Sequence, residues 1–148
     1  MVGYSNMLNN KGKNVKAIRY IDLFCGIGGF RVAVEQISSE LGIPAKCVFS
    51  SDIDEDCQRA YKENFGEKPA GDLTAVKAED IPDHDILLAG FPCQPFSIIG
   101  HRKGFDDTRG TLFFEIARIL EAKKPTAFVL ENVKLLAGHN NGKTLRRK

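Results

Sequence analysis

Short apolar runs alternate with helical patterns along most of this chain, and that alternation restricts the possible folds more than any other feature. Five apolar runs predict strands, at 17–24, 45–52, 71–76, 84–91 and 126–133. Three segments between them carry apolar side chains at helical spacing and predict helices, at 29–42, 54–66 and 109–124. Strand–helix alternation of this kind predicts an α/β fold, a doubly wound, mostly parallel sheet with helices on both faces.

The composition is that of one globular domain, with 43% hydrophobic and 27% charged residues in a chain of 148. Residues 1–16 are polar and predict a flexible lead-in, and the net charge of +2 decides nothing about nucleic acid. No pair of the four cysteines has C-x-x-C spacing, and no apolar run is long enough for a bilayer. We therefore expect no metal, no membrane and a cytoplasmic protein, nucleoid-associated if the source is bacterial.

Ligands bind at the carboxyl ends of the strands in such sheets, so the residues that end each apolar run are the first candidates. The first run ends in DLFCGIGGF, which places Gly26, Gly28 and Gly29 between a strand and a helix. Glycines allow a sharp turn and a close approach of the backbone to a ligand, although a purely structural turn gives the same pattern.

Acidic residues end the next two predicted strands. Asp52 is placed to accept hydrogen bonds from both hydroxyls of a ribose, Ile53 to pack on an adenine face, and Asp72 to accept from an adenine amino group. Each aspartate alone fits a helix cap or a solvated turn equally well. Together with the glycine turn, they favour a ligand that contains adenosine.

The stretch GFPCQPFSIIG, residues 90–100, places Cys93 where the fourth predicted strand ends. Pro92 stiffens the backbone there, so the thiol is held in a fixed position at the sheet edge. A buried turn cysteine is the alternative, and we expect that structural role for Cys25, Cys47 and Cys57.

These motifs, together with LENV at 130–133, resemble those of the DNA cytosine-5 methyltransferases, in particular small bacterial modification enzymes. The resemblance runs from Arg19 to about Leu145. It implies a Rossmann-like fold that uses S-adenosylmethionine, and transfer of its methyl group to carbon-5 of cytosine in double-stranded DNA. Restriction–modification is the setting that the resemblance suggests.

The resemblance also implies roles for individual residues. Cys93 would add covalently to a cytosine flipped out of the duplex, Glu131 would meet the cytosine ring, and Asn132 would help to orient it. The cofactor would be held by Phe24, Gly26, Gly28, Gly29, Asp52, Ile53, Asp72, Leu73, Gly90, Pro92 and Leu112.

The loop from Ser97 to Arg109 predicts a segment that contacts DNA and covers the extruded base. Its glycines permit motion, and its basic side chains suit phosphates. The candidates are Ser97, His101, Arg102, Lys103 and Arg109, with an ordinary solvated loop as the alternative.

The resembled enzymes continue with further motifs and a target-recognition domain beyond the segment that corresponds to 17–148. We therefore expect 17–148 to be a partial catalytic and cofactor-binding domain, truncated at its C-terminal side and without that recognition domain. Alone it should bind cofactor weakly and have little activity, and its last strand should lie at an exposed sheet edge. A C-terminal partner chain or missing segment would complete it. A truncated, split or degenerate enzyme, a tRNA cytosine-5 methyltransferase, and a non-catalytic binding subunit remain alternatives.

Overall fold

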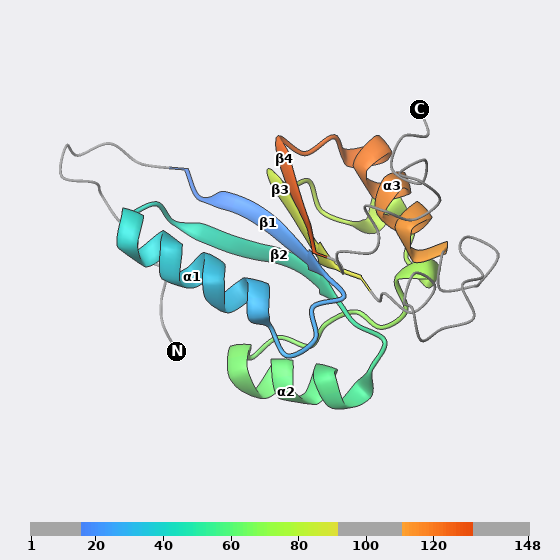
Figure 1. The fold of residues 1–148 in the computed structure, drawn as a ribbon, viewed down its shortest axis with the longest axis horizontal. Coiled ribbons are helices and arrows are strands. Elements are labelled where there is room, and N and C mark those ends of the chain that lie inside the picture. Colours follow the sequence, from blue (N-terminus) through green and yellow to red (C-terminus); the bar gives the residue numbers. More distant parts are fainter. Residues whose placement is uncertain (1–15, 92–110, 132–148) are drawn as a thin grey trace, which may run out of the picture.

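The described part of the chain is built on a sheet of four parallel strands. The computed structural model describes residues 16–91 and 111–131. The strands are β1 (Ile18–Leu23), β2 (Ala45–Ser51), β3 (Ile86–Gly90) and β4 (Ala127–Glu131), in the order β2-β1-β3-β4 (Figure 1). Every neighbouring pair is parallel, which confirms the predicted α/β class.

Three helices connect the strands: α1 (Gly29–Leu41), α2 (Glu55–Phe65) and α3 (Thr111–Lys123). Their ends follow from local chemistry. Asp54 begins α2, where its side chain accepts hydrogen bonds from the N–H groups of Asp56 and Cys57. Gly42 and Gly66 end α1 and α2 in left-handed backbone, where glycine carries no steric penalty.

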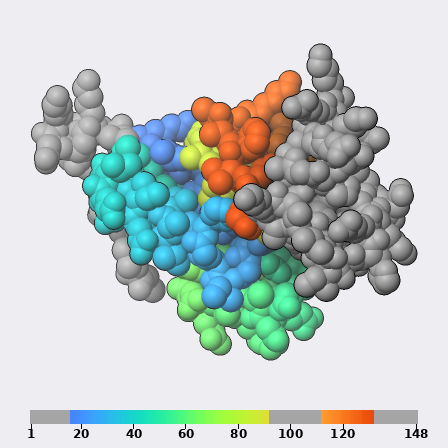
Figure 2. Space-filling model, viewed as in Figure 1, coloured from blue at the N-terminus to red at the C-terminus, as the bar shows by residue number. Residues whose placement is uncertain are grey.

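The helices cover both faces of the sheet, as predicted. Ile116 and Ile119 of α3 are fully buried against Ile21, Leu23 and Leu87, which point to one face. On the opposite face, side chains of α1 pack on Tyr20, Cys47 and Leu88. Figure 2 shows α1 and α2 together on the same side of the molecule, with α2 below α1. Among the helices of the described segments, none combines the length and apolarity needed to cross a bilayer.

The strand predicted at 71–76 is wrong. Leu73–Ala75 forms a short 3₁₀ turn, followed by another at Ala78–Asp80. The side chain of Asp72 accepts a hydrogen bond from the N–H of Thr74, which fixes a turn where the sequence pattern suggested a strand. The only β-type pairing of this neighbourhood in the described residues is a single bridge between Ala70 and Ser51.

β4 is the outermost strand of the described sheet on the side away from β2. Its Phe128 side chain is 57% exposed, and Val129 is exposed as well. An edge strand with apolar exposed side chains matches the expectation from the sequence. Residues 1–15, which hold almost all of the expected lead-in, lie outside the described residues.

Candidate functional site

The carboxyl ends of the four strands meet beside the turn that joins β1 to α1 (Figure 1). That turn has left-handed backbone at Phe24 (φ 55°), Gly26 (φ 53°) and Gly28 (φ 98°). Positive φ is strained for a residue such as Phe24, and strain of this kind concentrates at ligand-binding sites. Gly28 caps α1 and has no side chain to do so, and no side chain within 16–91 or 111–131 bonds to the N–H groups of the first helical turn. Free N–H groups at a helix start suit a polar ligand.

The glycines of the turn are required for different reasons. A Cβ atom on Gly28 would lie 2.2 Å from Cε2 of Phe65, so Gly28 makes room for the packing of α2. Among the described residues, a Cβ atom on Gly26 or Gly29 would meet nothing within 4 Å. Within this part of the chain, Gly26 and Gly29 therefore border space that a ligand could enter, whereas Gly28 has a structural function.

Asp52 links the end of β2 to the glycine turn. Its Oδ2 accepts a hydrogen bond of 2.7 Å from the N–H of Gly26, and its Oδ1 accepts one of 2.9 Å from the N–H of Asp54. Each carboxylate oxygen can accept a second bond, so Asp52 retains capacity for two ligand hydroxyls. The neighbouring Ile53 is 70% exposed, which leaves its apolar surface free for a flat ring.

Asp72 and Leu73 are placed differently from the expectation. Oδ1 of Asp72 accepts hydrogen bonds from the N–H and the hydroxyl of Thr74, so this carboxylate caps the 3₁₀ turn, although it is exposed. The side chain of Leu73 is buried in the core with Ile81 and Ile116. Only the backbone of Leu73 is therefore available to a ligand.

Gly90 and Glu131 lie side by side at the ends of β3 and β4, where they are register partners. A Cβ atom on Gly90 would lie 3.5 Å from Oε2 of Glu131 and 3.7 Å from Cε2 of Phe30. Helix α1 and strands β3 and β4 thus converge at this point. Glu131 is exposed, so the described residues do not provide the partly buried surroundings that its expected function calls for.

Leu112, in the first turn of α3, is half-buried. The next residue, Phe113, packs its ring 6.1 Å from that of Phe91, which follows β3. The start of α3 is therefore anchored near the end of β3. The remaining expected site residues lie outside the described residues: Pro92, Cys93, Ser97, His101, Arg102, Lys103, Arg109 and Asn132.

The three cysteines within 16–91 are poor nucleophiles. Cys25 and Cys47 are buried, Cys57 is half-buried, and all three are free thiols. Burial raises the pKa of each of these thiols above its ordinary value, which disfavours the reactive thiolate. This agrees with a structural function for them. No group of three His, Cys, Asp or Glu side chains within the described ranges is placed to hold a metal ion.

Asp22 lies near the carboxyl end of β1, and no function was predicted for it beyond that position. It is 0% exposed, and neither carboxylate oxygen has a hydrogen-bond partner among the described residues. Burial raises the pKa of Asp22 to about 7, Arg31 opposes that shift, and Asp52 adds to it. A carboxyl group without partners is expected to hold its proton when buried.

Asp22 should make the stability of the chain pH-dependent. Its folded pKa lies above the value of about 3.9 for an exposed aspartate. Its contribution is therefore complete below about pH 4 and is lost as the pH rises through about 7. Asp22→Asn removes this titration, so the stability of the variant relative to the parent should increase by about 2 kcal/mol between pH 5 and pH 8. Urea unfolding of both proteins measures the difference.

Asp80→Asn is the matched control, because Asp80 is exposed on a 3₁₀ turn. This variant should follow the parent at both pH values. If the relative stability of Asp22→Asn did not change with pH, Asp22 would not be protonated in the folded chain.

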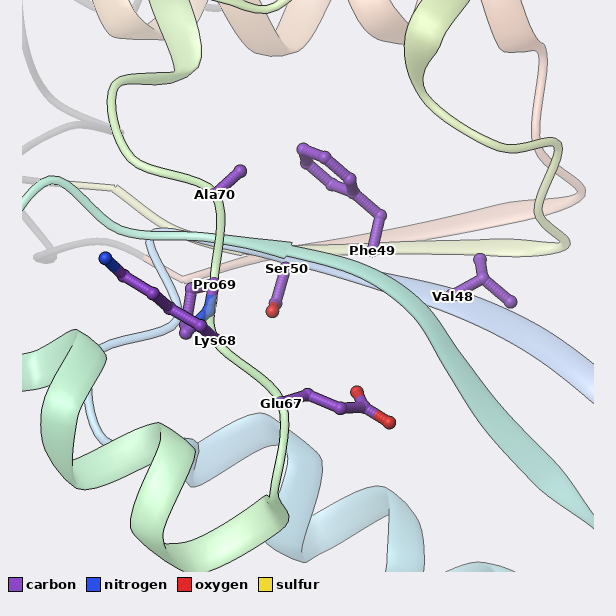
Figure 3. A pocket seen from close by; sticks show the side chains of 7 residues that line it. All are labelled: Val48, Phe49, Ser50, Glu67, Lys68, Pro69 and Ala70. Carbon is purple, nitrogen blue, oxygen red and sulfur yellow. The ribbon is translucent and has the colours of Figure 1, made fainter.

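A separate hollow of about 380 Å³ follows the outer edge of β2. Phe49 and Ala70 point to one side of the sheet, while Ser50 and Glu67 point to the other (Figure 3). The carboxylate of Glu67 is already paired with Arg31 at 2.9 Å. The hollow lies along the strand and not at its carboxyl end, so it is not part of the site described above.

Comparison with known proteins gives a consistent result. A family model described as C-5 cytosine-specific DNA methylase matches residues 18–148. Type II methyltransferase M.HhaI of Haemophilus parahaemolyticus is 55% identical over 139 residues, which are 94% of this chain and 41% of the relative. Type II methyltransferase M.HaeII of Haemophilus aegyptius is 58% identical over 132 residues, 89% of this chain and 40% of the relative.

Solved structures agree with these relatives. The Dnmt2 methyltransferase of S. pombe matches with a TM-score of 0.67 and 28% identity, over 87% of this chain and 40% of its own. The methyltransferase EhMeth of Entamoeba histolytica matches with a TM-score of 0.72 and 25% identity, over 88% of this chain and 42% of its own. The chain therefore has the Rossmann-like fold of these methyltransferases, and it spans about two fifths of the length of the relatives.

Proposed function

Because the chain belongs to the C-5 cytosine-specific DNA methylases, we propose that it provides the cofactor site and the reactive cysteine of an enzyme that methylates cytosine in DNA. Residues 17–148 would be the catalytic and cofactor-binding part. The observation that carries the proposal is the joined turn at the strand ends, in which the Asp52 carboxylate accepts the N–H of Gly26.

The described residues fit S-adenosylmethionine. Gly26 and Gly29 border open space, Asp52 has free acceptor capacity for a ribose, and the exposed Ile53 side chain suits an adenine face. The uncapped start of α1 offers N–H groups to the polar methionine part. When bound, the cofactor supplies an electrophilic methyl group.

The expected function of Cys93 is to make carbon-5 of cytosine nucleophilic. Its thiolate forms a bond to carbon-6, which turns the ring into an enamine that can attack the methyl group. Methyl transfer would leave S-adenosylhomocysteine as the product. A base would then take the carbon-5 proton, and the electrons of that C–H bond would re-form the C5–C6 double bond and expel the Cys93 thiolate. Glu131 would share a proton with ring N3 and so neutralise the charge that addition creates. Glu131 ends β4 and is the register partner of Gly90, which ends β3. Cys93 follows Gly90 by three residues in the sequence.

A base stacked in a duplex cannot be attacked in this way, so the enzyme must flip the cytosine out at a cost of a few kcal/mol. We assign the covering function to the segment with Ser97, His101, Arg102, Lys103 and Arg109, whose basic groups suit DNA phosphates. Asn132 would orient the base.

DNA is favoured over tRNA as the substrate. The family model that matches residues 18–148 is described as a DNA methylase, and two Type II methyltransferases match this chain with 55% and 58% identity. Restriction–modification is accordingly the proposed setting.

A chimera tests the proposal directly. In it, this chain replaces the matched segment of the Haemophilus parahaemolyticus relative, and labelled methyl transfer from S-adenosylmethionine is measured on duplex DNA and on tRNA. We expect label in DNA only. Label in tRNA would favour the RNA enzyme. DNA and cofactor binding without transfer would identify a non-catalytic binding subunit.

A further inference from the structure

The geometry points to Gln58 of α2 as a positioning residue of the cofactor site: its side-chain amide holds the backbone of Asp52 at the end of β2, beside the turn at Gly71–Asp72. The inference rests on the proposed function, because it deepens the description of the same site. Gln58 would act through the turn at Asp52 without touching the cofactor.

The side-chain amide of Gln58 lies between the two turns. Gln58 is only 7% exposed, and its Nε2 donates a hydrogen bond of 2.8 Å to the backbone carbonyl of Asp52. The same nitrogen faces Gly71, where an added Cβ atom would lie 3.9 Å from it. One buried amide group is therefore hydrogen-bonded to the segment expected to hold the ribose and lies beside the segment expected to hold the adenine.

Helix α2 fixes the position of that amide. Asp54 caps the helix, and the N–H of Gln58 donates to the carbonyl of Asp54 at 2.9 Å. Asp54 also donates its own N–H to Oδ1 of Asp52. The start of α2 is thus tied to Asp52 at both the side chain and the backbone, which limits the movement of Gln58.

Asp52 is held from the other side as well. Its N–H donates to the carbonyl of Ala70 at 2.9 Å, and the N–H of Ala70 donates to the carbonyl of Ser50 at 2.8 Å. These two bonds fix the position of the backbone before Gly71 relative to the end of β2. The Asp52 carbonyl accepts its hydrogen bond from the Gln58 amide, and not from the Gly71 segment. Loss of this bond should loosen the turn at Asp52 without dissolving the sheet.

Gln58→Met in the 148-residue chain is the first test, because methionine keeps the length of the side chain and removes the donor. Calorimetric titration should show S-adenosylhomocysteine binding about 10-fold more weakly than to the parent. Adenosine alone should lose the same factor, because the change affects the nucleoside part only. The control Gln36→Met makes the same replacement at an exposed position of α1 and should bind like the parent.

Two further measurements separate positioning from simple stabilisation. A structural function alone would lower the melting temperature of Gln58→Met and leave the dissociation constant of the folded chain unchanged, which would overturn the inference. Gln58→Glu also keeps the length and places an acceptor against the Asp52 carbonyl, so its binding loss should exceed that of Gln58→Met. A weaker effect of the glutamate would contradict the proposed hydrogen bond.

Amide hydrogen exchange tests whether Gln58 holds the Asp52 turn, and this test does not depend on whether the chain binds the cofactor. In the ligand-free chain, the Asp52 and Ala70 amides should exchange at least about 5-fold faster in Gln58→Met, while the Leu88 amide in central strand β3 keeps the parent rate. Unchanged exchange at Asp52 would overturn the positioning of this turn by Gln58. Absence of any S-adenosylhomocysteine binding by the parent chain and by the chimera, with the exchange effect present, would instead reject the cofactor site.

Discussion

Replacing Gly28 with alanine is expected to destabilise the chain by about 3 kcal/mol, because the added methyl group has no room and the backbone is left-handed at this residue. The new Cβ would lie 2.2 Å and 2.7 Å from two carbons of the Phe65 ring and 3.3 Å from Tyr61. Contacts that short require the ring to move.

The Phe65 ring cannot move freely. It packs against the Tyr61 ring in a tilted arrangement with centroids 4.6 Å apart, and the guanidinium of Arg31 lies 4.5 Å from its centroid. Arg31 is fixed in turn by Glu35, by Glu67 and by the Tyr61 hydroxyl. Relief of the clash would therefore disturb the whole contact between α1 and α2, which is why we expect a loss at the upper end of the range for overpacking.

Gly29→Ala is the matched control for Gly28→Ala. It adds the same methyl group one residue later, where no atom of the described residues lies within 4 Å and α1 has already begun. Urea unfolding should place its stability within about 1 kcal/mol of the parent. Its Cβ projects into the open side of the turn, so S-adenosylhomocysteine should bind more weakly. Equal tolerance of both replacements would contradict the described packing of α2 against the turn.

Cys93→Ala should abolish methyl transfer in the chimera with the Haemophilus parahaemolyticus relative. No other group in the proposed mechanism can form the bond to carbon-6, so the rate should fall by at least about 10⁴-fold. A DNA duplex with 5-fluorocytosine retains fluorine where the proton must leave, so the parent chimera should form a stable covalent adduct, visible as a slower band under denaturing conditions.

Cys57→Ala is the control for that experiment, since Cys57 is the half-buried cysteine of α2. It should keep both the adduct and the methyl transfer. Binding of cofactor by Cys93→Ala should also persist, because the cofactor site is attributed mainly to the glycine turn and Asp52. Transfer by Cys93→Ala at the parent rate would reject the covalent mechanism.

The sequence predicted most of the described fold because hydrophobic periodicity and helix ends are local signals. The Asp54 side chain begins α2, and the left-handed backbone of Gly42 and Gly66 ends α1 and α2, in each case where the sequence predicts it. The strand prediction for 71–76 was wrong, because a short run of mixed polar and apolar residues is compatible with both a strand and an Asx-type turn. The Asp72 side chain forms the turn.

The candidate site could be predicted only in part. Asp52 and the glycines stand at strand ends, where topology alone makes them neighbours. The position of Gln58 was not predictable, because its hydrogen bond joins a helix to a turn through tertiary packing. The same holds for Gly28, whose need for glycine comes from Phe65 on another helix, 37 residues away in sequence. Asp22 was recognisable as a strand-end carboxylate, but its complete burial was not.

The most direct test of the account is to find the residue that carries the trapped base. The chimera is incubated with S-adenosylmethionine and the 5-fluorocytosine duplex, digested with protease and nuclease, and examined by mass spectrometry. We predict a methylated fluorocytidine nucleotide attached to the peptide that contains Cys93. Attachment at any other residue, or methylated DNA without a covalent peptide, would contradict the proposal that this thiol performs the reaction.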